Sequence, residues 1–244
     1  MTTAIKIEGL TKRYKDVTAV EGLNLEISEG ELFSLLGVNG AGKTTTIKML
    51  STLVKPTSGD ATIFGYSVLQ DEEKIKEIID ISMQETAIAR KLTVEENIEF
   101  YGRLSGQDKA ELNEVKKIIY EAFGFEKIAK KQASKLSGGW QRKLSIALAL
   151  ISKPRILFLD EPTLGLDVIA RRELWKTING LKGKMTIILT THYMEEAEAL
   201  ADRIGIMKDG RLLFVGTKEE LFGKTGKTNV EDSFIEIVSG GESL

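Results

Sequence analysis

The chain has 244 residues, enough for one large domain or two small ones, and its 42% hydrophobic and 29% charged residues are typical of a globular protein. Its 34 basic and 36 acidic residues give a formal net charge of −2, so we expect no electrostatic surface for nucleic acid. The lack of cysteine excludes disulfides and thiolate metal sites, and a single histidine excludes histidine clusters. No apolar run is long enough for a membrane span and no signal core opens the sequence, so we expect a cytoplasmic protein.

The N-terminal residues predict short strands. Residues 4–8 and 23–27 alternate apolar and polar side chains, as strands with one buried face do. Tyr14 lies between them, and two interpretations of it are equally good: a half-buried strand residue, or a ring that stacks on an adenine. Residues 31–36 then predict a buried strand.

Residues 37–44, Gly-Val-Asn-Gly-Ala-Gly-Lys-Thr, match the phosphate-binding pattern G-x-x-x-x-G-K-[ST]. A glycine turn that matches by chance is disfavoured, because a predicted strand precedes the motif and a predicted helix follows it. The glycines let backbone N–H groups and the positive end of that helix face an anion. Lys43 is expected to reach the β- and γ-phosphates, and the Thr44 hydroxyl to bind Mg²⁺.

Residues 71–151 are predicted to be mainly helical. Thr93 and Glu96 have the spacing of a capping box, and the helix that follows them places Leu104 on its apolar face. A second helix is expected to carry Ile118 on its apolar face. We therefore expect a helical subdomain inserted into an α/β core.

Residues 136–141, Leu-Ser-Gly-Gly-Trp-Gln, open another predicted helix, which Pro154 stops. Ser137 is a natural N-cap, and the two glycines leave backbone amides uncovered. This is a second helix start suited to an anion. Taken alone, however, the stretch is better explained as a plain serine-capped helix with a glycine turn.

Residues 156–161 form an apolar run that ends in Asp160 and Glu161, which predicts a central, buried parallel strand. Carboxylates at the carboxyl end of such a strand emerge where open α/β sheets bind ligands. Asp160 can hold the Mg²⁺ shell, and Glu161 can orient and deprotonate an attacking water. A merely polar turn after the strand is disfavoured by the phosphate-binding loop upstream.

His192 follows a predicted strand over 185–190 and lies at the same carboxyl rim as Asp160, which favours a functional role over a structural one. Asp209-Gly210 predicts a β-hairpin, and Asn229 is expected to cap a last helix. The other predicted elements are strands over 60–65, 78–83, 203–207 and 211–215 and a helix over 168–181.

With these motifs in this order, the sequence resembles the ATP-binding subunits of ABC transporters over nearly its whole length. The Leu-Ser-Gly-Gly-x-Gln signature carries most of the likeness, because a phosphate-binding loop alone also occurs in kinases, GTPases and helicases. The resemblance implies an α/β fold: a P-loop NTPase (RecA-like) core with an N-terminal antiparallel β-subdomain and an inserted α-helical subdomain. It divides the chain into an ATPase domain at 1–225, with its core at 1–84 and 154–225 and its helical subdomain at 85–153, and a helical tail at 226–244.

The resemblance also implies roles for individual residues. Glu161 matches the catalytic base, with Lys43 and His192 acting on the γ-phosphate, and Tyr14 matches the aromatic that stacks on adenine. Mg²⁺ would be held by Thr44, Gln84 and Asp160. The signature would touch an ATP held by the other subunit. The implied nucleotide-binding residues are Tyr14, Gly37, Asn39, Gly40, Ala41, Gly42, Lys43, Thr44, Thr45, Gln84, Ser137, Gly138, Gly139, Asp167 and His192.

Residues 161–167, 191–198 and 232–234 look most like the ATPases of type-2 ABC exporters, such as the daunorubicin-resistance ATPases. Two positions depart from the pattern of that branch. Val38 replaces a proline that usually follows the first loop glycine, at some cost in rigidity. Trp140 occupies a place that usually holds methionine or glutamine, where its bulk is expected to lie at the dimer seam.

Two phosphate-binding helix starts in one chain argue for a dimer, because one nucleotide needs only one phosphate loop. We expect two copies to sandwich two Mg-ATP molecules, and a separate membrane permease to carry the cargo, with the ATPase on the inner face of the cell membrane. The alternatives are a non-transport ABC ATPase of DNA repair or translation, the ATPase of an importer, and a P-loop kinase or GTPase. The short insert and the single cassette count against the first, the motifs at 161–167 and 191–198 count moderately against the importer, and the signature counts against the kinase or GTPase.

Overall fold

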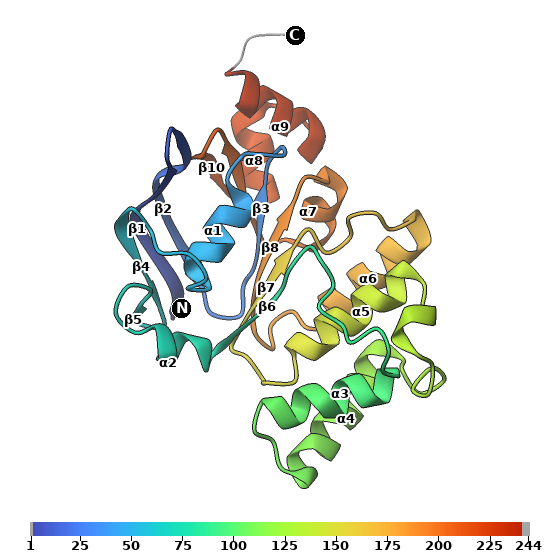
Figure 1. Cartoon of the computed structure of the whole chain (residues 1–244). Coiled ribbons are helices and arrows are strands. Elements are labelled where there is room, and N and C mark those ends of the chain that lie inside the picture. Colours follow the sequence, from blue (N-terminus) through green and yellow to red (C-terminus); the bar gives the residue numbers. More distant parts are fainter. Residues whose placement is uncertain (1, 241–244) are drawn as a thin grey trace.

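The computed structural model describes residues 2–240 and contains two β-sheets with helices between and around them (Figure 1). The smaller sheet is antiparallel, in the order β2–β1–β4–β5. Its first two strands are long, where the sequence predicted short ones, because register shifts interrupt the alternating pattern while the pairing continues. The strands are β1 (Thr3–Tyr14), β2 (Val17–Ser28), β4 (Ser58–Ile63) and β5 (Tyr66–Ser67).

The larger sheet has the order β10–β9–β3–β8–β7–β6, and all of its neighbours are parallel except the edge pair β9 and β10. Since β3, β8 and β7 are adjacent, their carboxyl ends meet at one rim: Leu36 pairs with Thr191, and Asp160 pairs with Thr190. The sheet therefore brings the predicted functional segments together. The strands are β3 (Leu32–Leu36), β6 (Ile79–Ser82), β7 (Ile156–Asp160), β8 (Thr186–Thr191), β9 (Arg203–Lys208) and β10 (Arg211–Gly216).

The larger sheet is buried on both faces, as a parallel sheet is expected to be. Strand β7 shows the division: Ile156 and Phe158 pack toward the antiparallel sheet, while Leu157 and Leu159 pack in the other core cluster. Helix α1 (Lys43–Leu50) lies between the two sheets. The other cluster includes residues of α5 (Gly138–Ala149), α6 (Val168–Asn179), α7 (Met194–Leu200), α8 (Lys218–Thr225) and α9 (Val230–Ser239).

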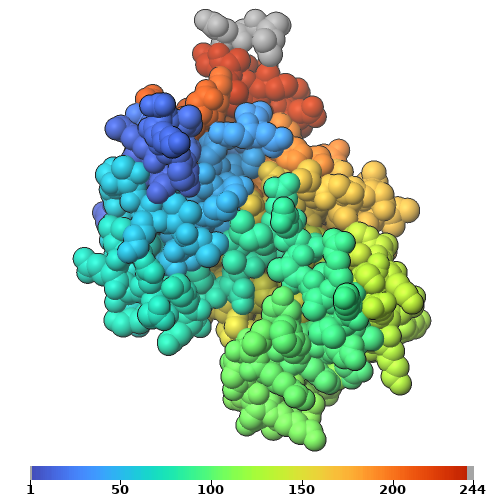
Figure 2. All heavy atoms as spheres, viewed as in Figure 1, coloured from blue at the N-terminus to red at the C-terminus, as the bar shows by residue number. Residues whose placement is uncertain are grey.

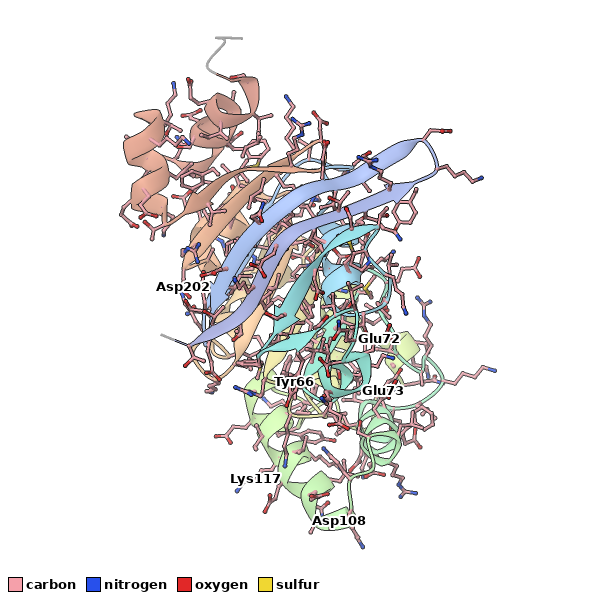
Figure 3. The ribbon with its side chains drawn as sticks, turned by 90° about the vertical axis from the view of Figure 1, so that its left-hand side faces the viewer. Tyr66, Glu72, Glu73, Asp108, Lys117 and Asp202 are labelled. Carbon is pink, nitrogen blue, oxygen red and sulfur yellow. The ribbon has the colours of Figure 1, made fainter. Side chains whose placement is uncertain are left out.

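Helices α3 (Val94–Leu104) and α4 (Lys109–Phe123) form a lobe that projects from the sheets (Figure 2). The predicted capping box is confirmed: the Thr93 hydroxyl accepts from the Glu96 amide, and the Glu96 carboxylate accepts from the Thr93 amide. A second capping box, at Asp108, starts α4 at the tip of the lobe (Figure 3). The two remaining elements are the short helix α2 (Glu72–Lys76) and a 3₁₀ turn at Ala133–Lys135.

Two predicted core positions in this lobe are wrong: Leu104 is 67% exposed and Ile118 is 65% exposed. The contact between α3 and α4 is made instead at Gly102, where an added Cβ would lie 2.3 Å from a methyl carbon of Leu112. Both helices share a hydrophobic cluster with α5 and the larger sheet, so the limits of the helical subdomain at 85 and 153 stay a prediction.

The C-terminal predictions are confirmed. Asp209 and Gly210 have φ angles of 49° and 78°, as a two-residue turn between antiparallel strands requires, and they join β9 to β10. Asn229 caps α9 by accepting from the amide of Asp232. Within residues 2–240, no helix has both the length and the apolar character that crossing a membrane demands.

We predict that T93A lowers the free energy of unfolding by about 1 kcal/mol, because the first turn of α3 loses its hydroxyl cap. The conservative T93S should stay near wild type, because serine supplies the same acceptor. Urea denaturation measures both. Equal stability of T93A and wild type would mean that the capping box adds nothing to the fold.

Candidate active site

A cavity of about 790 Å³ opens where the phosphate-binding loop meets the carboxyl rim of the larger sheet. The structure brings eleven of the predicted site residues to its walls. Gly37 and Asp160 lie beside it without lining it, and the signature and Asp167 lie elsewhere. The residues at the walls are Tyr14, Asn39, Gly40, Ala41, Gly42, Lys43, Thr44, Thr45, Gln84, Glu161 and His192, together with Val17, Thr18, Ala19, Leu164 and Asp209.

The loop at 37–44 owes its shape to close backbone contacts. A Cβ on Gly37 would lie 2.4 Å from the carbonyl oxygen of Met207. Gly42 has a φ of +104°, and a Cβ there would lie 2.4 Å from the carbonyl oxygen of Ala19. Gly42 is also the N-cap of α1 and offers no side-chain acceptor, so the first amides of the helix remain free for an anion.

Lys43 is buried and has three oxygen partners. Its Nζ donates to the carbonyls of Gly37 at 2.8 Å and Val38 at 3.1 Å, and lies 3.2 Å from Glu161 Oε1. A buried ammonium needs such partners because its desolvation is costly. The phosphate-binding loop is thus linked directly to the end of β7.

Four oxygen atoms gather at the buried end of β7. The Thr44 hydroxyl lies 3.0 and 3.1 Å from the two oxygens of Asp160, and the Thr190 hydroxyl donates to Asp160 Oδ1 at 2.6 Å. Hydroxyl and carboxylate oxygens are the ligands that Mg²⁺ prefers, and the amide of Gln84 lies at the wall of the same cavity. These residues fit a magnesium ion.

Glu161 sits in a strained backbone conformation, with a φ of +48°. Its amide is held by the carbonyl of Thr190 at 3.1 Å, and its Oε2 lies 2.6 Å from Nδ1 of His192. The turn aims the carboxylate into the cavity rather than along the strand. The structure therefore places a carboxylate, an imidazole and an ammonium around one point.

The signature lies away from this cavity. Ser137 is the N-cap of α5, as predicted, but its side chain accepts no capping bond, and both Ser137 and Gly138 are exposed. Trp140 is partly buried, with its ring 6.1 Å from that of Phe125. Asp167, the N-cap of α6, accepts from the amides of Ile169 and Ala170 at 2.9 Å. The predicted site residues thus form two separate groups.

Sequence reasoning missed Arg142, which is buried in α5. Its guanidinium donates only to carbonyls: those of Asp160 at 2.8 Å, Pro162 at 2.9 Å, Gln84 at 3.2 Å, and Met83. Burial lowers its pKa to about 10, and the negative charges of Asp160, Glu196 and Glu161 oppose that shift. Arg142 therefore joins the signature helix to the end of β6 and the end of β7. The only available signal was a charged residue among the apolar positions of a predicted helix.

Comparison with known proteins fits this geometry. The family model described as "ABC transporter" matches residues 20–164. The chain belongs to the ABC transporter family. A daunorubicin resistance ATP-binding protein, DrrA3 of Streptomyces coeruleorubidus, is 38% identical over 230 residues, which cover 94% of this chain and 73% of that protein. The family and the drug-resistance branch predicted from the sequence are confirmed.

Two further likenesses differ in how much of the related protein this ABC chain covers. ABC transporter A family member 4 of Arabidopsis thaliana is 44% identical over 214 residues, which cover 87% of this chain and only 23% of that protein. A solved structure, titled "Structure of ATP binding subunit of ABC transporter", superposes with a TM-score of 0.85 at 27% identity and covers 97% of this chain and 100% of that one. The predicted ABC ATPase fold is therefore confirmed.

We predict that R142K lowers the free energy of unfolding of the ABC chain by about 1–3 kcal/mol, because one ammonium cannot satisfy the buried carbonyls that the guanidinium serves. The matched change R172K, at an exposed arginine of α6, should alter stability by about 0.5 kcal/mol or less. Urea denaturation of both variants tests this. Indistinguishable midpoints would show that the carbonyl contacts of Arg142 are dispensable.

Proposed function

We propose that this chain binds Mg-ATP, hydrolyses it, and powers export through a separate membrane permease. The observation that carries the proposal is the convergence of Lys43, Glu161 and His192 in one cavity behind a phosphate-binding loop. An ammonium for the phosphates, a base for water and an imidazole at the γ-phosphate are the groups that phosphoryl transfer to water needs.

The nucleotide enters with its adenine on Tyr14, which is 45% exposed and lies at the wall of the cavity. The triphosphate lies along the loop, over the uncovered amides of α1. Lys43 exchanges its carbonyl contacts at Gly37 and Val38 for the β- and γ-phosphates. This exchange also weakens the hold of Lys43 on Glu161 and leaves that carboxylate free to accept a proton.

Thr44, Asp160 and Gln84 would hold the magnesium ion, which neutralises charge on the β- and γ-phosphates when bound. Glu161 orients the attacking water and takes its proton. His192 steadies the carboxylate through the 2.6 Å contact and contacts the γ-phosphate. The strained φ of Glu161 keeps its carboxylate in place before the nucleotide arrives.

The second group, Ser137, Gly138, Gly139 and Asp167, serves the nucleotide of another subunit. These residues lie outside the cavity of their own chain, and the uncapped, exposed start of α5 suits a γ-phosphate. In a head-to-tail homodimer, each ATP would be held by Lys43 of one copy and covered by the signature of the other. Closure then requires the γ-phosphate, and its hydrolysis reopens the pair.

Transport places the dimer on the inner face of the cell membrane, against the permease. The segment from Gln84 to Asn97 would receive a short cytoplasmic helix of that partner. Export is supported by the similarity to a daunorubicin-resistance protein. Arg142 donates to the backbone carbonyls of both Gln84 and Asp160, so a movement of that segment would be transmitted to the end of β7.

We predict that E161Q lowers the turnover of ATP by about a hundredfold or more, because the amide cannot take a proton from water. ATP binding should persist, so Mg-ATP should convert E161Q into dimers that sedimentation velocity detects, while ADP leaves monomers. Turnover of E161Q near the wild-type rate would contradict the role of Glu161 as the base. E161Q that remains monomeric in saturating Mg-ATP would contradict the proposed sandwich dimer.

We predict that K43A loses most of the rise in melting temperature that Mg-ATP gives wild type, because ligand stabilisation follows the affinity lost with the ammonium. The comparison is made with and without nucleotide for each variant, since K43A also unpairs the buried Glu161. K48A, on the same helix but outside the cavity wall, is the control and should keep the full shift. A full shift in K43A would contradict the assigned role.

A further inference from the structure

A second carboxylate is buried in the core behind the cavity. Glu196 lies on α7 and is 0% exposed. Its Oε1 accepts from the indole N–H of Trp175, on α6, at 2.9 Å. It lines no cavity described above, and none of the steps proposed for ATP hydrolysis uses it. A glutamate is seldom fully buried unless the fold gives it partners, so its place calls for an explanation.

Two buried polar atoms have no hydrogen-bond partner of normal geometry among the described residues: Oε2 of Glu196 itself and the hydroxyl of Thr163. Both residues are 0% exposed, so water cannot serve either atom from the surface. Burial raises the pKa of Glu196, and the hydroxyls of Thr191 and Thr163 and the indole of Trp175 oppose that rise. Both threonine hydroxyls therefore lie near the carboxylate. That of Thr191 already accepts from the amide of Tyr193 at 3.0 Å, whereas that of Thr163 has no other partner among the described residues.

The groups around Glu196 come from three segments, and each segment carries a site residue. Thr163 lies in the turn between Glu161 and Asp167, held by a bond from the Leu166 amide to the Thr163 carbonyl. Thr191 immediately precedes His192 at the end of β8. Trp175 belongs to α6, whose N-cap is Asp167. One buried side chain thus lies among the three segments that carry Glu161, His192 and Asp167.

We propose that Glu196 is a positioning residue for ATP hydrolysis: its carboxyl group bonds Thr163 when the turn at 161–167 settles around nucleotide. The bond pairs two buried polar atoms and holds the turn that sets the direction of Glu161. Glu196 touches neither nucleotide nor water. The inference rests on the proposed ATPase function and assigns a new residue to the same site.

The test compares kcat and the KM for ATP in T163V and T163S. Valine fills the same space without a hydroxyl, whereas serine keeps the hydroxyl. We expect T163V to lower kcat by about fivefold or more with KM unchanged within about twofold, and T163S to restore most of the loss. Loss of stability alone would lower the active fraction without separating the two threonine variants in this way, so active-site titration with nucleotide normalises the rates.

The second arm replaces the carboxylate. E196M keeps the length of the side chain and removes both oxygens, and we expect a fall in kcat of about tenfold or more with KM near wild type. E196Q keeps an acceptor for Trp175 and a polar group for Thr163, and should retain most activity. E195Q makes the same change at the exposed neighbour and should match wild type. The double variant E196M/T163V should lose no more than E196M alone, because the two changes break one contact.

Wild-type kcat in T163V, or additive losses in the double variant, would overturn the proposal. If E196M fails to fold, the threonine pair decides alone. A wild-type protein without ATPase activity would instead refute the proposed function, so the two failures are distinguishable.

Discussion

The buried contact between Lys43 and Glu161 is the interaction on which the site depends. The two side chains lie 3.2 Å apart, almost without solvent, and they come from the helix after β3 and from the end of β7. Neither charge is tolerable there alone, because the desolvation of each is costly. His192 extends the contact to the end of β8, so three neighbouring strands are joined through their functional side chains. The pairing of Asp160 with Thr190 keeps the carboxylate of Asp160 beside these charges.

This contact is possible only because the backbone is held in unusual conformations around it. Gly37 and Gly42 let the loop approach the chain at Met207 and Ala19 more closely than any side chain allows. Glu161 accepts a positive φ without being glycine, and the hydrogen bond from its amide to Thr190 balances part of that strain. The strain is local and the packing that opposes it is extensive, since β7 is buried on both faces. The fold therefore stabilises a reactive arrangement that no short segment would keep by itself.

Much of the fold and of the candidate site was predictable from the sequence, because the motifs that indicate them are local. The phosphate-binding loop, the carboxylates after β7, the capping box at Thr93 and the hairpin at Asp209 each lie within a few residues. Signals that depend on distant partners were not predictable. The contacts of Arg142 lie on segments far from it along the chain, so its burial among carbonyls has no local signature. Periodicity placed Leu104 and Ile118 in the core, but it cannot tell which positions a neighbouring helix covers, and here Gly102 receives the contact.

Packing contacts within one chain connect the two groups of site residues. The start of α5 rests on α6: a Cβ on Gly139 would lie 2.9 Å from that of Ala170, and Lys143 bonds Glu173 at 3.1 Å. The lysine also lies 4.7 Å from the ring of Trp140. The signature helix therefore packs directly against α6, the helix that Asp167 caps. Arg142, on the same helix α5, donates hydrogen bonds to the backbone carbonyls of Asp160 and Gln84. In the proposed dimer, a displacement of the residues that face one nucleotide would then be transmitted to the residues that face the other, because α5 contacts both groups.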